Sequence, residues 1–229
     1  MSQKNFADFL HERIEKTDSV LCVGIDPVLE SFPQEILELA KTTSTNDTDF
    51  VYHAIMSFYS DAIDGGKEDI ACIKPNIAFF EQYGPGALKA LQELVAQAKQ
   101  AGIPVILDAK RGDIGNTARA YAASYFGGSS NSIVPGMLDV DALTVHPYLG
   151  FDTLEPYLPY LKERGKGLFV LVRTSNPGAN DIQGLPDSSA VPVFQRVAEW
   201  RNSYHQCDCQ RPFALFRDKD FLSSLSIVV

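Results

Sequence analysis

The sequence predicts an α/β fold in which parallel strands alternate with helices and close into a (β/α)8 barrel. Short, nearly continuous apolar runs alternate with amphipathic segments along the 229 residues, which is typical of parallel strands covered on both faces. Each run ends in polar residues, and the carboxyl ends of barrel strands converge on one face. An open, doubly wound sheet also fits the alternation, but it needs such residues only near its switch point, so we favour the barrel.

Five apolar runs are the strand candidates. They are 20–27 ("VLCVGIDP"), 70–77 ("IACIKPNI"), 103–110 ("IPVILDAK"), 142–149 ("ALTVHPYL") and 167–175 ("GLFVLVRTS"). The polar residues at their carboxyl ends are Asp26, Lys74, Asp108, Lys110, His146, Arg173 and Ser175.

Six segments between and beside these runs have helical patterns. They cover residues 4–16, 50–65, 86–102, 113–126, 151–164 and 192–202. Gly102 ends the third helix and Pro104 restarts the chain, which is the usual order of helix stop signals. The alternation predicts βαβ units with right-handed crossovers.

The last part of the chain departs from this rhythm. The final 45 residues, after Gly184, contain no glycine, whereas the preceding part holds all 16. "PFALF" and "LSIVV" are possible strands, but only five good strands are visible, so the last three strands of a barrel are missing or unrecognisable. We expect a partial barrel over 1–200 and an atypical tail over 201–229, with a frameshift or truncation near Arg201.

The composition excludes several classes of partner and site. A net charge of −9 argues against nucleic acid or an anionic membrane as the main partner. No apolar stretch approaches the roughly 18 residues of a membrane span, and the N-terminus lacks the apolar centre of a secretory signal, so we expect a cytoplasmic protein with reduced cysteines. His205, Cys207 and Cys209 lie close together in "HQCDC", but no second ligand pair has zinc spacing, and no metal is expected.

The stretch "LDAKRGD" (107–113) carries the clearest chemistry. Asp108 and Lys110 are two residues apart in a strand and should project to the same side, where Lys74 from another strand end can join them. A lysine held protonated by acids can donate a proton and stabilise a carbanion, while a carboxylate beside an anionic group favours its departure. This array suits cofactor-free loss of carbon dioxide. The alternatives are a loop ion pair of Asp108 with Arg111 and a first-turn helix acid at Asp113.

Several motifs together resemble those of orotidine 5′-phosphate decarboxylases. "LDAKRGDIGNTA" matches the pattern D-x-K-x-x-D-[IV]-x-x-T, and "VGIDP", "CIKPNIAFFE", "LTVHPYLG" and "LVRTSNPGA" follow in the family's order. They are similar to its longer bacterial-type branch over roughly residues 1–200. The resemblance implies a TIM-barrel homodimer that converts orotidine 5′-monophosphate to UMP and carbon dioxide in de novo pyrimidine biosynthesis, without a cofactor.

The resemblance also implies roles for four catalytic residues. Lys74, Asp108 and Lys110 come from one subunit, and Asp113 reaches into the partner's site. Lys110 protonates the pyrimidine C6 as carbon dioxide leaves, and Asp108 presses on the departing carboxylate and helps to hold Lys110.

Three further residues are implied to bind the substrate. Asp26, together with Lys74, binds ribose hydroxyls, Thr117 contacts the neighbouring subunit's ribose, and Ser175 meets the pyrimidine. The alternatives are simple turn roles for Asp26, which precedes Pro27, and for Ser175.

The family's glycine-rich phosphate loop and late arginine have no counterpart in the sequence. Contacts to the phosphate lie far from the bond that breaks, but their binding energy lowers the reaction barrier. Loss of the phosphate-binding groups should therefore impair turnover as well as substrate affinity. Two alternative functions are an aldolase-like phosphosugar barrel enzyme with a Schiff-base lysine at Lys74 or Lys110, and an inactive dimerising remnant that presents Asp113 to a partner.

Overall fold

Five parallel strands form the centre of the molecule in a computed structural model that describes residues 5–128 and 133–203. Their pairing follows chain order: β1 (Leu21–Ile25), β2 (Ile70–Pro75), β3 (Ile106–Arg111), β4 (Ala142–Val145) and β5 (Gly167–Val170). Parallel ladders join β1 to β2, and β3 through β4 to β5, with a register shift in the β1–β2 and β3–β4 pairs, and two single bridges join β2 to β3. This sequential order is that of a (β/α)8 barrel, whereas a doubly wound sheet reverses its order at the switch point.

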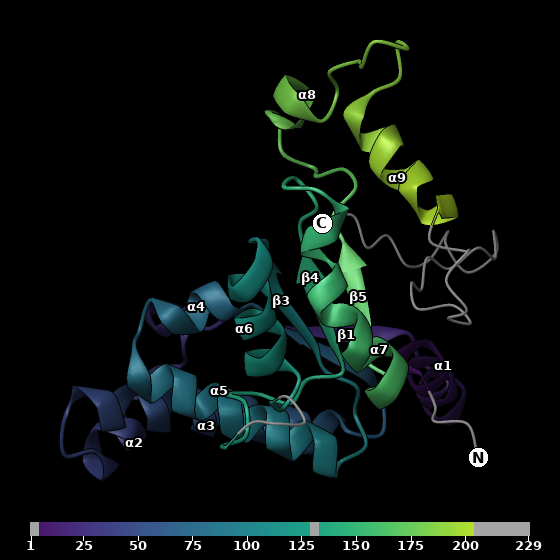
Figure 1. The fold of residues 1–229 in the computed structure, drawn as a ribbon. Helices are drawn as coiled ribbons and strands as arrows, with labels where there is room; N and C mark the ends of the chain where they lie inside the picture. Colours follow the sequence, from purple (N-terminus) through teal and green to yellow (C-terminus); the bar gives the residue numbers. More distant parts are fainter. Residues whose placement is uncertain (1–4, 129–132, 204–229) are drawn as a thin grey trace.

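The described part of the chain has nine α-helices, of which α8 and α9 project beyond the strands in Figure 1. Their bounds are α1 Phe6–Thr17, α2 Gln34–Thr43, α3 Asp47–Gly66, α4 Ile77–Glu81, α5 Pro85–Gln100, α6 Gly115–Tyr125, α7 Leu158–Arg164, α8 Ala179–Ile182 and α9 Val193–Ser203. Short 3₁₀ turns cover Leu29–Ser31, Phe151–Thr153 and Glu155–Tyr157. In Figure 1, α3 and α5 lie beside the lower left of the sheet, and α6 and α7 lie in front of it.

Local side-chain chemistry explains where several helices begin. Asn5, Asn46 and Asn76 are the N-caps of α1, α3 and α4, and each side-chain oxygen accepts a hydrogen bond from a backbone N–H of the first turn. Such caps satisfy donors that the helix itself leaves unpaired. Asn76 also explains why the second strand stops at Pro75 rather than at residue 77, because the chain turns there into α4.

One predicted helix differs from the structure, and three observed helices have no predicted counterpart. The expected helix over 151–164 is two 3₁₀ turns followed by α7. Pro156 and Pro159 lie in the first turns of the last two pieces, and a proline cannot donate the backbone hydrogen bond that would join them into one helix. The helices α2, α4 and α8 have no counterpart among the predicted helices.

The two faces of the sheet have different coverings. The residues that face α3, α5 and α6 belong to the main apolar core and include Ile73, Leu107, Leu143 and Leu168. The residues between them in the strands point to the other, inner face, where Phe6 and Leu10 of α1 pack against Cys72, Ile106 and Ala142. These contacts place α1 over the lower part of the inner face. Burial of each of the two α1 side chains contributes roughly 1.5–3 kcal/mol to the stability of the fold.

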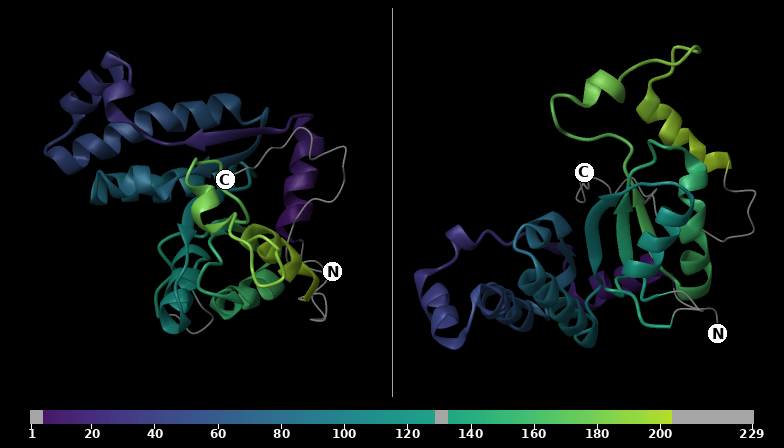
Figure 2. Two further views of the ribbon diagram at one scale, coloured as in Figure 1. Left: turned by 90° about the horizontal axis from the view of Figure 1, so that it is seen from above. Right: turned by 60° about the vertical axis from the view of Figure 1, so that its left-hand side comes forward.

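The outer edges of the sheet are β1 and β5, and within the described ranges no strand pairs with either outer edge. Cys22 of β1 is exposed there. Figure 2 shows β1 crossing the direction of the later strands, as expected for a strongly twisted sheet. The five described strands thus form the first part of a barrel, with the inner face open between β1 and β5.

The predicted boundary at residues 200 and 201 lies inside α9 and stays a prediction. Residues 204–229, which include "PFALF", "LSIVV" and the "HQCDC" group, lie outside the described residues. No helix in the described part of the chain combines the length and the apolar character needed to cross a bilayer.

Candidate active site

A buried carboxylate between two lysines lies at the carboxyl ends of β2 and β3. The Nζ atom of Lys74 lies 2.6 Å from Oδ2 of Asp108, and the Nζ atom of Lys110 lies 2.6 Å from Oδ1 of the same residue. The Asp108 side chain is 4% exposed, whereas those of Lys74 and Lys110 are 25% and 39% exposed. The sequence predicted these three residues as one cluster, and the structure brings them together.

The charges around Asp108 keep its carboxyl group ionised. Burial acts to raise its pKa, but hydrogen bonds from Lys110 and Lys74 outweigh burial and hold the pKa below its ordinary value. Hydrogen bonds between oppositely charged groups at this distance are among the strongest in proteins. At neutral pH the site therefore presents a carboxylate with an ammonium group on each oxygen.

The backbone at Lys110 has an unusual conformation. Its φ angle is 47°, in the left-handed region, and the β3–β4 register shifts between Leu107 and Arg111. A non-glycine residue in this region costs roughly 1–2 kcal/mol, so neighbouring contacts must hold it. Lys110 and Asp108 meet as predicted, but a local bulge, not the simple alternation of a strand, directs the lysine.

Thr144 of β4 supports this bulge and was not among the predicted site residues. Its hydroxyl accepts hydrogen bonds from the backbone N–H groups of Ala109 and Lys110, both at 2.9 Å, and donates one to Oδ1 of Asp108 at 2.9 Å. In the sequence, Thr144 lies two residues before His146, in the predicted strand over 142–149, and this position could have indicated it as a site residue.

Arg111 anchors the start of the loop after β3. Its guanidinium forms an ion pair with Glu81 of α4, donates through Nε to the hydroxyl of Tyr125 at 3.1 Å, and lies over the ring of Tyr121. The alternative in which Arg111 pairs with Asp108 is therefore wrong. The arginine joins β3 to α4 and α6 outside the cluster.

Gly112 lies against the ring of His146. A Cβ atom at position 112 would meet Nε2 of His146 at 2.2 Å, closer than any side chain can approach. A side chain at position 112 would therefore require the imidazole to move, because the loop passes directly beside it.

Asp113 and Thr117 do not join the cluster of their own chain. Asp113 is half-buried, and its Oδ1 atom accepts a hydrogen bond from the backbone N–H of Ile114 at 2.7 Å. Thr117 is exposed in the first turns of α6. The hydrogen bonds and ion pairs of the Lys74–Asp108–Lys110 cluster in the described chain include neither of these residues.

Asp26 lies at the edge of the cluster, directly after β1, and is exposed. Partial burial raises its pKa above the ordinary value, Lys74 acts to lower it, and Asp108 raises it further. These influences place Asp26 within electrostatic reach of the two cluster residues. Ser175 is exposed in the loop between β5 and α8, and no contact joins it to the cluster in the described structure.

A metal site would need several His, Cys, Asp or Glu side chains close together in the described residues. Those residues hold no group of three or more His, Cys, Asp or Glu arranged to bind an ion. The "HQCDC" group, where no metal is expected, lies outside them.

Comparison with known proteins shows close similarity to one family. Residues 19–208 match the model of the orotidine 5′-phosphate decarboxylase / HUMPS family. The chain is 43% identical over 194 residues to orotidine 5′-phosphate decarboxylase of Rhodopirellula baltica, covering 85% of this chain and 62% of that protein. It is 41% identical over 198 residues to the Halorubrum lacusprofundi enzyme of the same name, covering 85% of this chain and 60% of that protein. The chain thus spans about three fifths of the length of these relatives.

Solved structures show the same similarity. The structure of Leishmania donovani OMP decarboxylase aligns with a TM-score of 0.63 at 36% identity, over 85% of this chain and 64% of that one. Plasmodium berghei orotidine 5′-monophosphate decarboxylase, at 21% identity, aligns with a TM-score of 0.71 over 88% of this chain and 72% of that one, which supports the fold alone. The predicted α/β TIM-barrel class is confirmed, with five barrel strands in the described part. The chain belongs to the orotidine 5′-phosphate decarboxylase / HUMPS family.

Proposed function

We propose that the Lys74–Asp108–Lys110 cluster is the catalytic centre of a cofactor-free decarboxylase that converts orotidine 5′-monophosphate to UMP and carbon dioxide in de novo pyrimidine biosynthesis in the cytoplasm. The observation that carries the proposal is the Asp108 carboxylate, buried and held at 2.6 Å by a lysine on each oxygen. The names of the relatives support the choice of substrate.

The reaction needs one proton donor and no electron acceptor. The bond between C6 and the substrate carboxylate breaks, carbon dioxide leaves, and the electron pair stays on C6. The Lys110 ammonium stabilises this charge and transfers its proton to C6, and solvent then returns a proton to the partly exposed lysine. Asp108 opposes the substrate carboxylate before the bond breaks, and the hydrogen bonds that it accepts from Lys74, Lys110 and Thr144 keep it from turning away.

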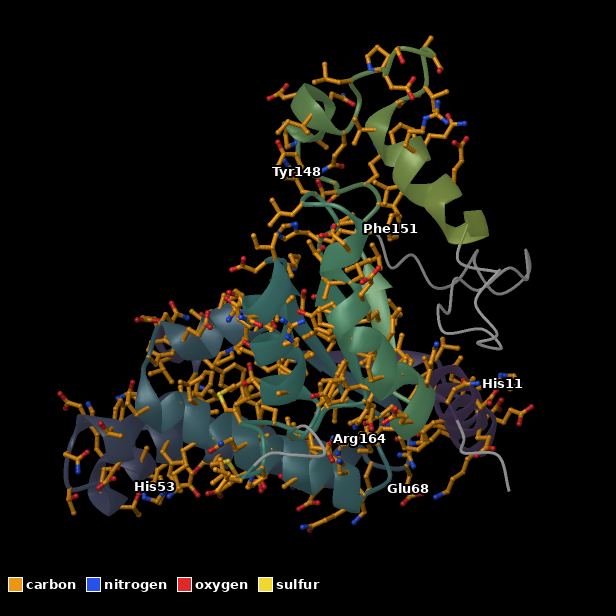
Figure 3. All side chains as sticks on the ribbon, in the orientation of Figure 1. His11, His53, Glu68, Tyr148, Phe151 and Arg164 are labelled. Carbon is orange, nitrogen blue, oxygen red and sulfur yellow. The ribbon has the colours of Figure 1, made fainter. Side chains whose placement is uncertain are left out.

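A second subunit completes the proposed site. Asp113 would enter the partner's cluster and Thr117 would contact the partner's ribose, and neither is engaged by the cluster of its own chain. Exposed apolar side chains surround this end of the sheet: Ile114 is 59% exposed and Tyr148 is 72% exposed. Figure 3 shows Tyr148 and Phe151 at the end opposite Arg164. A partner subunit packed on this end would remove these side chains from water, which favours the proposed homodimer.

Substrate contacts within one subunit follow from the strand ends. Asp26 and Lys74 would bind ribose hydroxyls, and Ser175 would reach the pyrimidine when the loop after β5 approaches the inner face. The family's glycine-rich phosphate loop has no counterpart in the sequence. We therefore expect a low kcat/KM for this chain alone, because phosphate contacts supply binding energy that is used in the transition state.

The direct test is UMP formation from orotidine 5′-monophosphate by the purified chain and by its Lys110→Ala variant. The variant should form no UMP while it still binds UMP. A matched control is Lys89→Ala, which removes an exposed helix lysine away from the site and should keep the original rate. Normal turnover in Lys110→Ala would refute the role of Lys110.

Borohydride treatment with substrate separates the aldolase-like alternative. A decarboxylase of the proposed kind forms no imine, so mass spectrometry should find no reduced adduct on Lys74 or Lys110. An adduct on either lysine would favour a Schiff-base enzyme.

A further inference from the structure

The hydroxyl of Thr144, beside the cluster, has all of its hydrogen-bonding capacity satisfied by protein groups. Its residue is 1% exposed and lies in β4, on the strand next to the one that carries Asp108 and Lys110. Three hydrogen bonds of 2.9 Å connect the hydroxyl to Ala109 N–H, Lys110 N–H and Asp108 Oδ1.

We propose that Thr144 is a positioning residue for the decarboxylation, whose hydroxyl holds the Asp108 carboxylate and the bulged Lys110 backbone in one fixed arrangement. The inference rests on the proposed function of the cluster and adds a residue that touches neither substrate nor reacting atoms.

The direction of each hydrogen bond follows from the chemistry of the partners. A hydroxyl has one proton and two lone pairs. Two backbone N–H groups can only donate, so they occupy both lone pairs, and the single proton must go to the ionised carboxylate. The hydroxyl has no capacity left for water, and its orientation is fixed by three groups at once.

The position of these bonds explains why they affect the lysine. Lys110 has a left-handed backbone at the point where the β3–β4 register shifts. At such a bulge the strand ladder cannot pair every N–H, and Thr144 supplies the missing acceptor for two successive groups. Without the hydroxyl, two inward N–H groups would lose their partner and the bulge could relax, which would move the Lys110 ammonium away from the reacting carbon.

Threonine is also suited to the task by its shape. A β-branched side chain in a strand has a restricted χ1 angle, so the hydroxyl needs little further ordering. Valine has nearly the same shape and lacks only the hydroxyl. Serine keeps the hydroxyl and loses the methyl group.

The test uses the full chain with Thr144→Val and Thr144→Ser. Thr153→Val is the matched control, because Thr153 is also buried and uses its hydroxyl in one hydrogen bond, to the carbonyl of Gly150. Two quantities are measured: the titration midpoint of the Asp108 carboxyl carbon by NMR without substrate, and kcat and KM for UMP formation.

Loss of the hydroxyl should change the site without weakening substrate binding. In Thr144→Val the Asp108 midpoint should rise by about one pH unit, because the ionised form loses a hydrogen bond, and kcat should fall about tenfold with KM nearly unchanged. Thr144→Ser should restore most of both quantities, and Thr153→Val should match the original chain. An unchanged midpoint and kcat in Thr144→Val, or a serine variant that behaves like valine, would overturn the inference.

The two readouts separate this inference from the proposed function. If the original chain forms no UMP but Thr144→Val still shifts the Asp108 midpoint, the positioning of Asp108 stands and the proposed function fails. If the chain is active and the valine variant is unaltered in both readouts, the function stands and the positioning role fails. Should Thr144→Val not fold, Thr144→Ala and Thr144→Ser form a second pair that differs by the hydroxyl, and the same difference between them is expected.

Discussion

Replacing Asp108 by asparagine removes the negative charge between two lysines while it keeps the size of the side chain. Both lysines then lose a charge-assisted hydrogen bond at 2.6 Å, and one of the two positions facing them becomes an N–H₂ group that cannot accept. A hydrogen bond to a charged group contributes about 1.5–3 kcal/mol. Because Lys74 and Lys110 can turn partly toward water, we discount the sum and expect the free energy of unfolding to fall by about 1–3 kcal/mol.

The effect of Asp108→Asn can also be measured through the pH dependence of the free energy of unfolding. The folded pKa of Asp108 is below its unfolded value, so the unfolded state binds more protons as the solution is acidified. The stabilisation by this carboxylate is fully present above its unfolded pKa of about 3.9 and is lost as the pH falls through the folded value. Asp108→Asn lacks the stabilisation by the ionised carboxylate at every pH. The free energy of unfolding of the original chain should therefore fall toward that of the variant as the pH is lowered.

Urea unfolding of both proteins between neutral and acidic pH measures this difference. Asp61→Asn, at an exposed position of α3, is the control and should follow the original curve. Other carboxylates with lowered pKa, such as Asp139, contribute equally to all three proteins and cancel. Equal stability of Asp108→Asn and the original chain at every pH would refute the assignment of Asp108 as a stabilised, ionised centre.

Three further outcomes follow from the packing. Gly112→Ala forces a methyl group against the His146 ring and should lower the free energy of unfolding by about 1–3 kcal/mol in a denaturant titration; unchanged stability would mean that the loop lies elsewhere. Phe6→Ala empties a buried site between α1 and the sheet and should cost about 3–5 kcal/mol by the same measurement, whereas a cost below 1 kcal/mol would show that α1 is not docked. Asp113→Ala should leave stability within about 0.5 kcal/mol but abolish UMP formation, and full activity in this variant would exclude a site shared between subunits.

The arrangement of Arg111 illustrates how a charged run divides between tasks. The motif has Asp108, Lys110, Arg111 and Asp113 within six residues. Two of them form the buried cluster, the arginine joins α4 and α6 on the helical side, and Asp113 lies beyond the strand against the start of α6. Neighbours in the sequence therefore act on different sides of one strand end.

Much of the fold could be predicted from the chain alone. The apolar runs, Gly102 and the residues at strand ends indicated all five strands and their order, because these signals depend on backbone periodicity and on local turn chemistry. The motif indicated Lys74, Asp108 and Lys110 as one site, because carboxyl ends of parallel strands meet at one face. The single helix predicted over 151–164 is wrong, because Pro156 and Pro159 cannot donate the backbone hydrogen bonds that would join the pieces.

Tertiary structure alone decided how the cluster is held. The left-handed Lys110, the register shift of β3 on β4, and the three bonds of Thr144 depend on pairing between strands more than thirty residues apart in the chain. No local pattern records which hydroxyl will face which backbone N–H after such pairing. The sequence by itself determined the chemical groups and the strand ends that carry them, whereas the packing of neighbouring strands determined their distances and directions, because those arise only when distant segments share one sheet.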